Sequence, residues 1–309
     1  MNGFIVVTGA SGWVGKTALF ELQKILPSED FQKRVLAFAS SKKFYETTLY
    51  SKNFKIPVYP LLELSNFAKN HNLSFLFHCA FLTREKVNIL GIEEYIRINK
   101  SIINSVCSAC KSFPNIKIIS ISSGAANKYT SEKNFLKELH SDPYGVLKRE
   151  EELRIQSFSN SLILRIYALS GRFMKEPNIF ALGNFIIKAM QNEKIQITSQ
   201  TPVIRSYGNA SDICKFAWSW LFDENNVKFS SPINAVSLTL KLDKLAQEVS
   251  NTFNSPGVVC DWDSRLKPNS YIAETDTFKK SLEFYGLRPK SLIEQIKDSS
   301  INIDKDSFI

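Results

Sequence analysis

Tyr144 and Lys148 stand four residues apart, a spacing that places both side chains on one face of a helix. A free tyrosine has a pKa of about 10 and exchanges protons poorly at neutral pH. A neighbouring ammonium favours the phenolate and lowers that pKa. The pair therefore predicts acid–base catalysis by Tyr144, tuned by Lys148. Because this spacing often arises by chance, the prediction depends on what surrounds the pair.

A pair of serines, Ser122 and Ser123, ends the β-branched run at residues 116–122. In open α/β sheets, the carboxyl ends of the strands face the crevice where ligands bind. A serine hydroxyl at that end of a strand can polarise a carbonyl group beside Tyr144. The order along the chain, with the serines before the Tyr–Lys pair, therefore favours a catalytic cluster over surface residues.

A glycine-rich segment, TGASGWVG at residues 8–15, follows the first β-branched run and opens a stretch with helical spacing. Glycines there permit a tight turn and a close approach of backbone N–H groups to phosphate. The amino terminus of the following helix adds a partial positive charge. The segment predicts a dinucleotide site whose cofactor-binding residues are Gly9, Ser11, Gly12, Trp13, Val14 and Gly15.

The residues after the second apolar run indicate which dinucleotide binds. NAD sites commonly carry an acidic residue there, which holds the ribose 2′-hydroxyl. This chain has Ser40, Ser41, Lys42 and Lys43 instead. Hydroxyl and ammonium groups suit a 2′-phosphate, so Ser40, Ser41 and Lys42 are predicted to bind NADP(H), and NAD is disfavoured. The alternative is that the lysines belong to a solvated loop.

Short apolar runs alternate with helical patterns through the first half of the chain. This alternation predicts an α/β fold with a Rossmann-type doubly wound parallel sheet. After Gly171, prolines divide the chain into shorter elements, which predicts a smaller C-terminal substrate-binding lobe. The predicted dinucleotide-binding domain is residues 1–170, with 206–236 returning to it, and the predicted lobe is residues 171–205 and 237–309.

Composition excludes several classes of function. The net charge is +9, but the basic residues are dispersed, so we expect no nucleic-acid partner. Since no apolar run approaches the roughly 20 residues that span a bilayer and no leader opens the chain, we expect a cytoplasmic protein without a membrane partner. The C-x-x-C of Cys107 and Cys110 lies in a helical stretch and is expected to pack in the core, with no metal site.

With these pieces in order, the chain resembles the extended short-chain dehydrogenase/reductase superfamily, in its NAD-dependent epimerase/dehydratase group. The resemblance implies that Ser123, Tyr144 and Lys148 are catalytic and that Lys148 also binds the nicotinamide ribose. It implies further that Cys79 and Ala80 line the cofactor, and that Asn184 and Arg205 bind a substrate diphosphate. The segments that carry the resemblance are TGASGWVG, FHCAF at 77–81, IRIN at 96–99, ISISSGAA at 119–126, YGVLK at 144–148, LILRIYALSG at 162–171 and RSYGNASDI at 205–213.

One departure narrows the reaction that the resemblance implies. In the related 4,6-dehydratases, Asp and Glu follow the catalytic hydroxyl residue, whereas Gly124 and Ala125 follow Ser123 here. We therefore expect an NADPH-dependent reductase of a nucleotide-activated 4-keto-6-deoxy sugar, with Tyr144 as proton donor, by analogy in surface polysaccharide biosynthesis. The alternatives are a nucleotide-sugar epimerase with tightly bound NAD and a non-catalytic NADP-binding regulatory module. The family further implies a homodimer through helices at 92–112 and 144–157.

Overall fold

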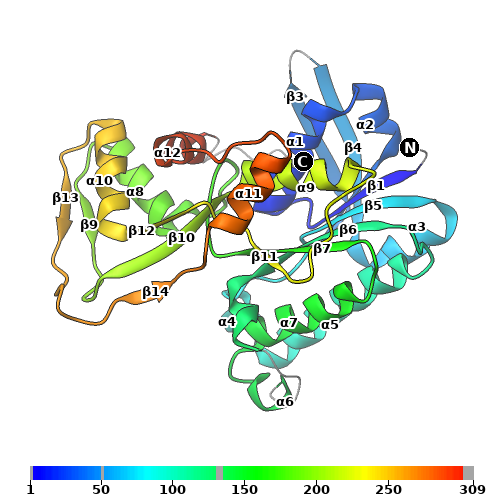
Figure 1. Ribbon diagram of the computed structural model, residues 1–309, viewed down its shortest axis with the longest axis horizontal. Helices are drawn as coiled ribbons and strands as arrows, with labels where there is room; N and C mark the ends of the chain where they lie inside the picture. The colour runs from blue at the N-terminus through cyan, green and yellow to red at the C-terminus, as the bar shows by residue number, and fades with distance from the viewer. Residues whose placement is uncertain (1–2, 50–51, 130–134, 302–309) are drawn as a thin grey trace. The chain divides into compact units, whose positions relative to one another are not determined.

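The computed structural model describes residues 3–49, 52–129 and 135–301. The chain divides into two compact units (Figure 1). Among the described residues, the first extends to Arg165 and includes Ala217–Ile233, and the second comprises Ile166–Phe216 and residues 234–301. Residues 206–216 thus fall in the second unit. No helix among the described residues is both long enough and apolar enough to cross a bilayer.

The first unit is built on an eight-stranded sheet whose strand order is β11-β7-β6-β5-β1-β2-β4-β3. The order reverses at β1: the chain moves outward to β2 and β4, then returns to β5 on the other side, so the crevice for a ligand opens beside β1. The strands are β1 (Phe4–Thr8), β2 (Val35–Ala39), β3 (Lys43–Leu49), β4 (Lys52–Pro60), β5 (Leu73–His78), β6 (Lys117–Ser123), β7 (Ser161–Ile166) and β11 (Ile233–Asn234).

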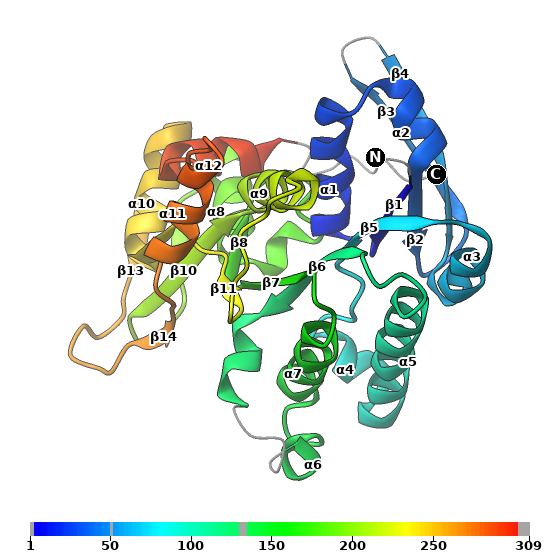
Figure 2. The same cartoon turned by 45° about the vertical axis from the view of Figure 1, so that its right-hand side comes forward.

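The central strands are parallel and buried, which confirms the predicted α/β fold. Their side chains are apolar on both faces because helices cover both sides of the sheet. Figures 1 and 2 show α5 and α7 side by side along one face. The helices of this unit are α1 (Trp13–Ile25), α2 (Ser28–Arg34), α3 (Leu64–Asn70), α4 (Lys86–Leu90), α5 (Ile92–Cys110), α6 (Phe135–Glu138), α7 (Pro143–Gln156) and the part of α9 (Ala210–Phe222) from Ala217 on, with 3-10 turns η1 (Leu61–Glu63) and η2 (Gly124–Lys128).

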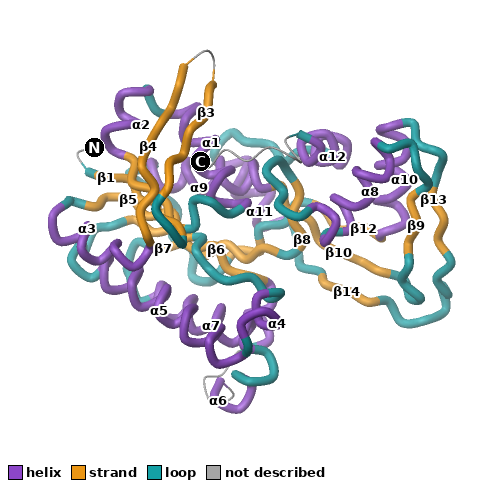
Figure 3. Tube along the Cα trace, turned by 180° about the vertical axis from the view of Figure 1, so that it is seen from behind, coloured by secondary structure: helices purple, strands orange, loops and turns teal. Residues whose placement is uncertain are grey.

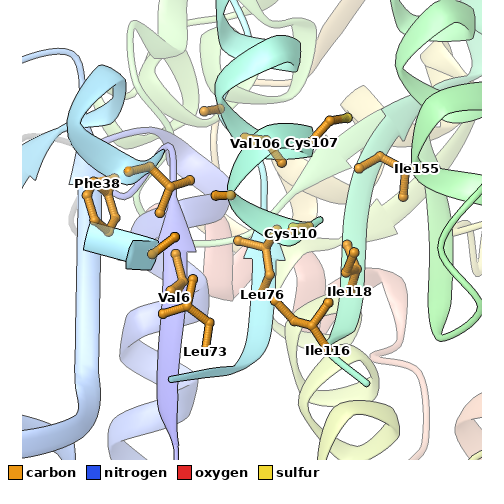
Figure 4. Packing of buried hydrophobic residues seen from close by; sticks show 14 of the residues in the cluster. Val6, Phe38, Leu73, Leu76, Val106, Cys107, Cys110, Ile116, Ile118 and Ile155 are labelled. Carbon is orange, nitrogen blue, oxygen red and sulfur yellow. The ribbon is translucent and has the colours of Figure 1, made fainter. Parts of the chain in front are cut away.

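Cys107 and Cys110 lie on the buried face of α5 and pack into the core between that helix and the sheet (Figure 4). Their neighbours there include Val6 and Ile118. Burial raises the pKa of the Cys110 thiol to about 12 and moves that of Cys107 in the same direction. Both side chains therefore act as small apolar groups, as the sequence predicts.

The segment after β2 differs from the sequence expectation in one respect. The alternative to cofactor binding places Lys42 and Lys43 together in a solvated loop, whereas β3 and β4 form an antiparallel hairpin in which Lys43 pairs with Val58. The hairpin forms because Tyr45 and Ile56 are buried on its inner face. The loop is therefore confined to residues 40–42.

The second unit has a four-stranded sheet in which β10 (Val203–Asn209) pairs with β12 (Leu238–Lys241), β14 (Asn269–Tyr271) and β8 (Ala168–Ser170). A separate pair joins β9 (Ile195–Ile197) to β13 (Val258–Cys260). The helices are α8 (Ala181–Met190), α10 (Leu242–Phe253), α11 (Asp276–Phe284) and α12 (Leu292–Ser300), with the 3-10 turn η4 (Pro177–Ile179) (Figure 3). A capping box of Ser291 and Glu294 begins α12.

Candidate active site

The glycine-rich segment forms a turn that only glycine can make at two of its positions. Gly9 has φ +68°, and a Cβ there would lie 2.7 Å from backbone atoms of Cys79 and Ala80. A Cβ on Gly15 would lie 2.1 Å from the carbonyl oxygen of Gly9. At Gly12 the crowding is milder, since the nearest atom lies 3.2 Å away. Gly9 and Gly15 are thus required by the fold, whereas Gly12 leaves space beside the turn.

This turn leads directly into the amino terminus of α1. The N-cap is Gly12, which has no capping side chain, and the first turn carries no acidic residue. The partial positive charge of the helix end is therefore uncompensated by nearby carboxylates of its first turn, which suits a phosphate. Ser11, Trp13 and Val14 are partly exposed at this end. The cradle fits a dinucleotide, and the roles of its residues remain predictions.

The loop predicted to hold a 2′-phosphate lies at the carboxyl end of β2. Ser40, Ser41 and Lys42 are all exposed there. The amide of Ala10 donates to the carbonyl oxygen of Phe38 at 3.0 Å, which ties the glycine-rich turn to the end of the same strand. The loop therefore begins beside the phosphate cradle, and its hydroxyl and ammonium groups are accessible to a ligand.

Ser123 and Tyr144 meet where β6 ends and α7 begins. Ser123 is the last residue of β6, and its Oγ accepts from the amide of Ala125 at 3.2 Å. Tyr144 stands in the first turn of α7, where the side chain of Asp142 caps the helix by accepting from the amide of Gly145. A side-chain hydrogen bond joins Ser123 to Tyr144. The structure thus brings together two residues that lie far apart in sequence.

The pKa of the Tyr144 phenol is raised, chiefly because burial disfavours the phenolate. The hydrogen bond from Ser123 and the charge of Arg84 act in the opposite direction. The guanidinium carbon of Arg84 lies 5.2 Å from the centre of the Tyr144 ring, and Phe81 meets the ring edge-on. The expectation that the Tyr–Lys spacing lowers this pKa is therefore wrong for the unliganded protein: burial outweighs the groups that favour the phenolate, and Tyr144 holds its proton.

Arg84 offers a test of this balance of charges. Since its positive charge lowers the pKa of Tyr144, Arg84→Gln should move the phenol ionisation upward by about half a pH unit, because exposed charges interact weakly. Ultraviolet difference titration against a Tyr144→Phe variant measures this ionisation directly. Exchanging the exposed Lys86 for Gln gives a matched surface control, and an equal shift in both variants would contradict a specific effect of Arg84.

Lys148 is buried, with 4% of its surface exposed. Its ammonium donates to the carbonyl oxygen of Ile121 at 2.9 Å and to Oε2 of Glu151 at 2.9 Å. It also lies 3.8 Å from the centre of the Phe81 ring, a cation–π contact. Three independent contacts therefore fix this ammonium on the same face of α7 as Tyr144.

The sequence expectations did not include Glu151, Glu152 or His78. Three successive glutamates at 150–152 are typical of a solvated helix face, yet Glu151 and Glu152 are 1% and 0% exposed. His78, which ends β5, is likewise buried and binds Glu151. The only sequence signal for Glu151 is its position three residues after Lys148, on the same helix face.

Glu152 separates the roles of the two serines. Its carboxylate accepts from the hydroxyl of Ser122 at 2.7 Å and from the guanidinium of Arg165 on β7, also at 2.7 Å. Because successive residues of a strand point to opposite faces, Ser122 faces this buried network while Ser123 faces Tyr144. Ser122 is therefore structural, and Ser123 remains the candidate for catalysis.

Asn184 and Arg205 lie in the second unit. Asn184 is partly buried on α8. Arg205 on β10 donates to the backbone oxygen of Asn269 at 2.7 Å and to its Oδ1 at 3.1 Å, and burial lowers the pKa of its guanidinium. These contacts hold the Arg205 side chain against β14. Binding of a diphosphate by either residue remains a prediction.

The chain is similar to proteins of known structure over almost its whole length. It aligns with UDP-glucose 4-epimerase from Thermotoga maritima at 14% identity and a TM-score of 0.69, covering 96% of each chain. With UDP-glucuronic acid 4-epimerase from Bacillus cereus, solved with UDP-glucuronic acid and NAD, the values are 16% and 0.68, covering 96% of this chain and 97% of the other. With UDP-N-acetylglucosamine 4-epimerase from Methanobrevibacter ruminantium M1 they are 19% and 0.68, covering 96% of each.

At these identities the likeness is one of fold. No curated protein sequence matches this chain. The model of the NAD dependent epimerase/dehydratase family, however, matches residues 5–232, which contain both the glycine-rich turn and the Ser123, Tyr144 and Lys148 cluster. The chain therefore belongs to the NAD dependent epimerase/dehydratase family.

Proposed function

We propose that this protein catalyses hydride transfer between a nicotinamide dinucleotide and a ring carbon of a nucleotide-activated sugar. The observation that carries the proposal is the cluster of Ser123, Tyr144 and Lys148 in the same unit as an uncapped, glycine-lined helix terminus. When bound, the nicotinamide supplies or accepts the hydride. The nucleotide sugar is proposed because the similar solved proteins are named as enzymes of UDP-sugars.

The chain's own residues would move the proton. In the reductive direction Tyr144 donates its proton to the oxygen of the former ketone, and Ser123 donates a hydrogen bond to that oxygen as charge develops. Tyr144 holds its proton in the unliganded protein, because burial raises the pKa of the phenol. Lys148 stabilises the resulting phenolate until the proton is replaced. We therefore propose an NADPH-dependent reductase of a 4-keto-6-deoxy nucleotide sugar.

An epimerase with bound NAD is the second candidate. It is supported by the similar epimerase solved with NAD and by the family to which the chain belongs. The same cluster would serve, with Tyr144 removing a proton in one half-reaction and returning it in the other. The candidates differ in stoichiometry: the reductase consumes NADPH with a keto sugar, whereas the epimerase interconverts sugars without added dinucleotide.

The proposed 2′-phosphate site in the loop at 40–42 gives a direct prediction. The protein should bind NADPH more tightly than NADH, as followed by nicotinamide fluorescence. Lys42→Glu should weaken NADPH binding about tenfold or more, because one charge-assisted contact to the 2′-phosphate is replaced by repulsion. Lys43→Glu, in the β3 ladder, is the matched control. Tighter binding of NADH to the unmodified protein would contradict the NADP proposal and favour the epimerase.

Four further expectations also remain proposals. A homodimer would pair α5 and α7 of two chains, and light scattering of the purified protein tests its mass. A cytoplasmic location and a place in polysaccharide biosynthesis rest on the sequence alone. A non-catalytic regulatory role is less favoured, because the hydroxyl, phenol and ammonium groups that turnover needs are all present.

A further inference from the structure

A chain of buried polar side chains leads from the first strand to Lys148. The hydroxyl of Thr8 lies 2.6 Å from Nδ1 of His78, and Nε2 of His78 lies 2.8 Å from Oε1 of Glu151. The other oxygen of Glu151 accepts from Lys148 at 2.9 Å. Thr8, His78, Glu151 and Lys148 are 0%, 1%, 1% and 4% exposed.

Each carboxylate oxygen of Glu151 therefore has its own partner: Oε1 binds His78 and Oε2 binds Lys148. Burial alone would raise the pKa of this carboxyl, but the charge of Lys148 and the hydrogen bonds from Lys148 and His78 outweigh it, and the pKa is lowered. A buried carboxylate persists only when it is paired and hydrogen-bonded in this way. Glu151 thus carries a fixed negative charge on the helix face that Tyr144 shares.

Several charged or polar groups face Tyr144 from the surrounding elements. Arg84, in the segment after β5, and Ser123, at the end of β6, favour its phenolate. Glu85 and Glu151 oppose it. Tyr95 on α5 is the other titratable neighbour. Of these groups only Glu151 is both buried and bound to Lys148.

We propose that Glu151 is a positioning residue of the Tyr144–Lys148 pair, which holds the Lys148 ammonium in place and balances its charge. The proposal rests on the proposed function, because it assigns Glu151 a task in the same proton transfer. The His78–Thr8 link fixes the carboxylate from the side opposite Lys148.

The test is the ionisation of Tyr144 itself, which needs no substrate. Phenolate absorbance is titrated in the full-length protein, and the Tyr144→Phe titration is subtracted to isolate this residue. Glu151→Gln, measured against Glu151→Gln/Tyr144→Phe, should lower the midpoint by about one pH unit, because it leaves the Lys148 charge unbalanced and removes a charge of the same sign as the phenolate. An unchanged or higher midpoint would overturn the proposal. Absence of sugar turnover would instead count against the proposed function alone.

Glu152→Gln is the matched control. It removes a neighbouring buried carboxylate that binds Ser122, Arg149 and Arg165 rather than Lys148. Its midpoint should stay at that of the unmodified protein even if its stability falls, and an equal shift in both variants would refute a specific role for Glu151. If Glu151→Gln fails to fold, Glu151→Met carries the same prediction, because it removes the charge without burying an unsatisfied amide.

Discussion

Replacing Tyr144 by Phe should lower kcat by about 10²- to 10⁴-fold, the usual contribution of a positioned general acid. The phenol is the proton donor in the proposed reaction, and its hydrogen bond to Ser123 is lost with it. Binding of NADPH should change little, since the ring remains. Steady-state kinetics with a 4-keto-6-deoxy nucleotide sugar and fluorescence titration of the dinucleotide measure the two effects separately.

Tyr45→Phe is the matched control for this variant. Tyr45, in β3, is also a buried tyrosine, and its hydroxyl donates to Oε1 of Gln23 at 3.3 Å. Its replacement should cost about 1 kcal/mol of stability and leave kcat within a few-fold. If Tyr144→Phe kept most of the activity, the assignment of Tyr144 as proton donor would be wrong, whether or not the stability of the variant changed.

Two glycine variants should separate the fold of the phosphate cradle from its binding role. Gly15→Ala should destabilise the protein by about 1–3 kcal/mol, because its Cβ would lie 2.1 Å from the Gly9 carbonyl oxygen and force the turn to shift. Dinucleotide binding should fall with it. Gly12→Ala meets only one atom, at 3.2 Å, so its stability should change by less than about 1 kcal/mol.

The same Gly12→Ala variant should nevertheless bind the dinucleotide about 10- to 100-fold more weakly, since its methyl would displace phosphate from a helix-terminal N–H contact. Thermal denaturation reports the stability of each variant, and fluorescence titration reports binding. Normal binding by Gly12→Ala would show that phosphate does not approach this side of the turn, and would remove the cradle from the proposed site.

The sequence alone determined the parts of this protein that depend on local pattern. Unbroken apolar runs identify buried parallel strands, and the glycine spacing at 9, 12 and 15 predicts a turn between a strand and a helix. The family followed from the same segments, and the match over residues 5–232 confirms it. The spacing of Tyr144 and Lys148 predicts a shared helix face because four residues make about one helical turn.

The tertiary structure decided which polar residues are buried and which partners they meet. Local pattern suggests that residues 150–152 are solvated, but α7 packs beside α5 against the sheet, so Glu151 reaches His78 and Glu152 reaches Arg165. The local sequence likewise does not predict the β3–β4 hairpin, since its stability comes from burying Tyr45 and Ile56. Such contacts join residues tens of positions apart, and no short window of sequence contains both partners.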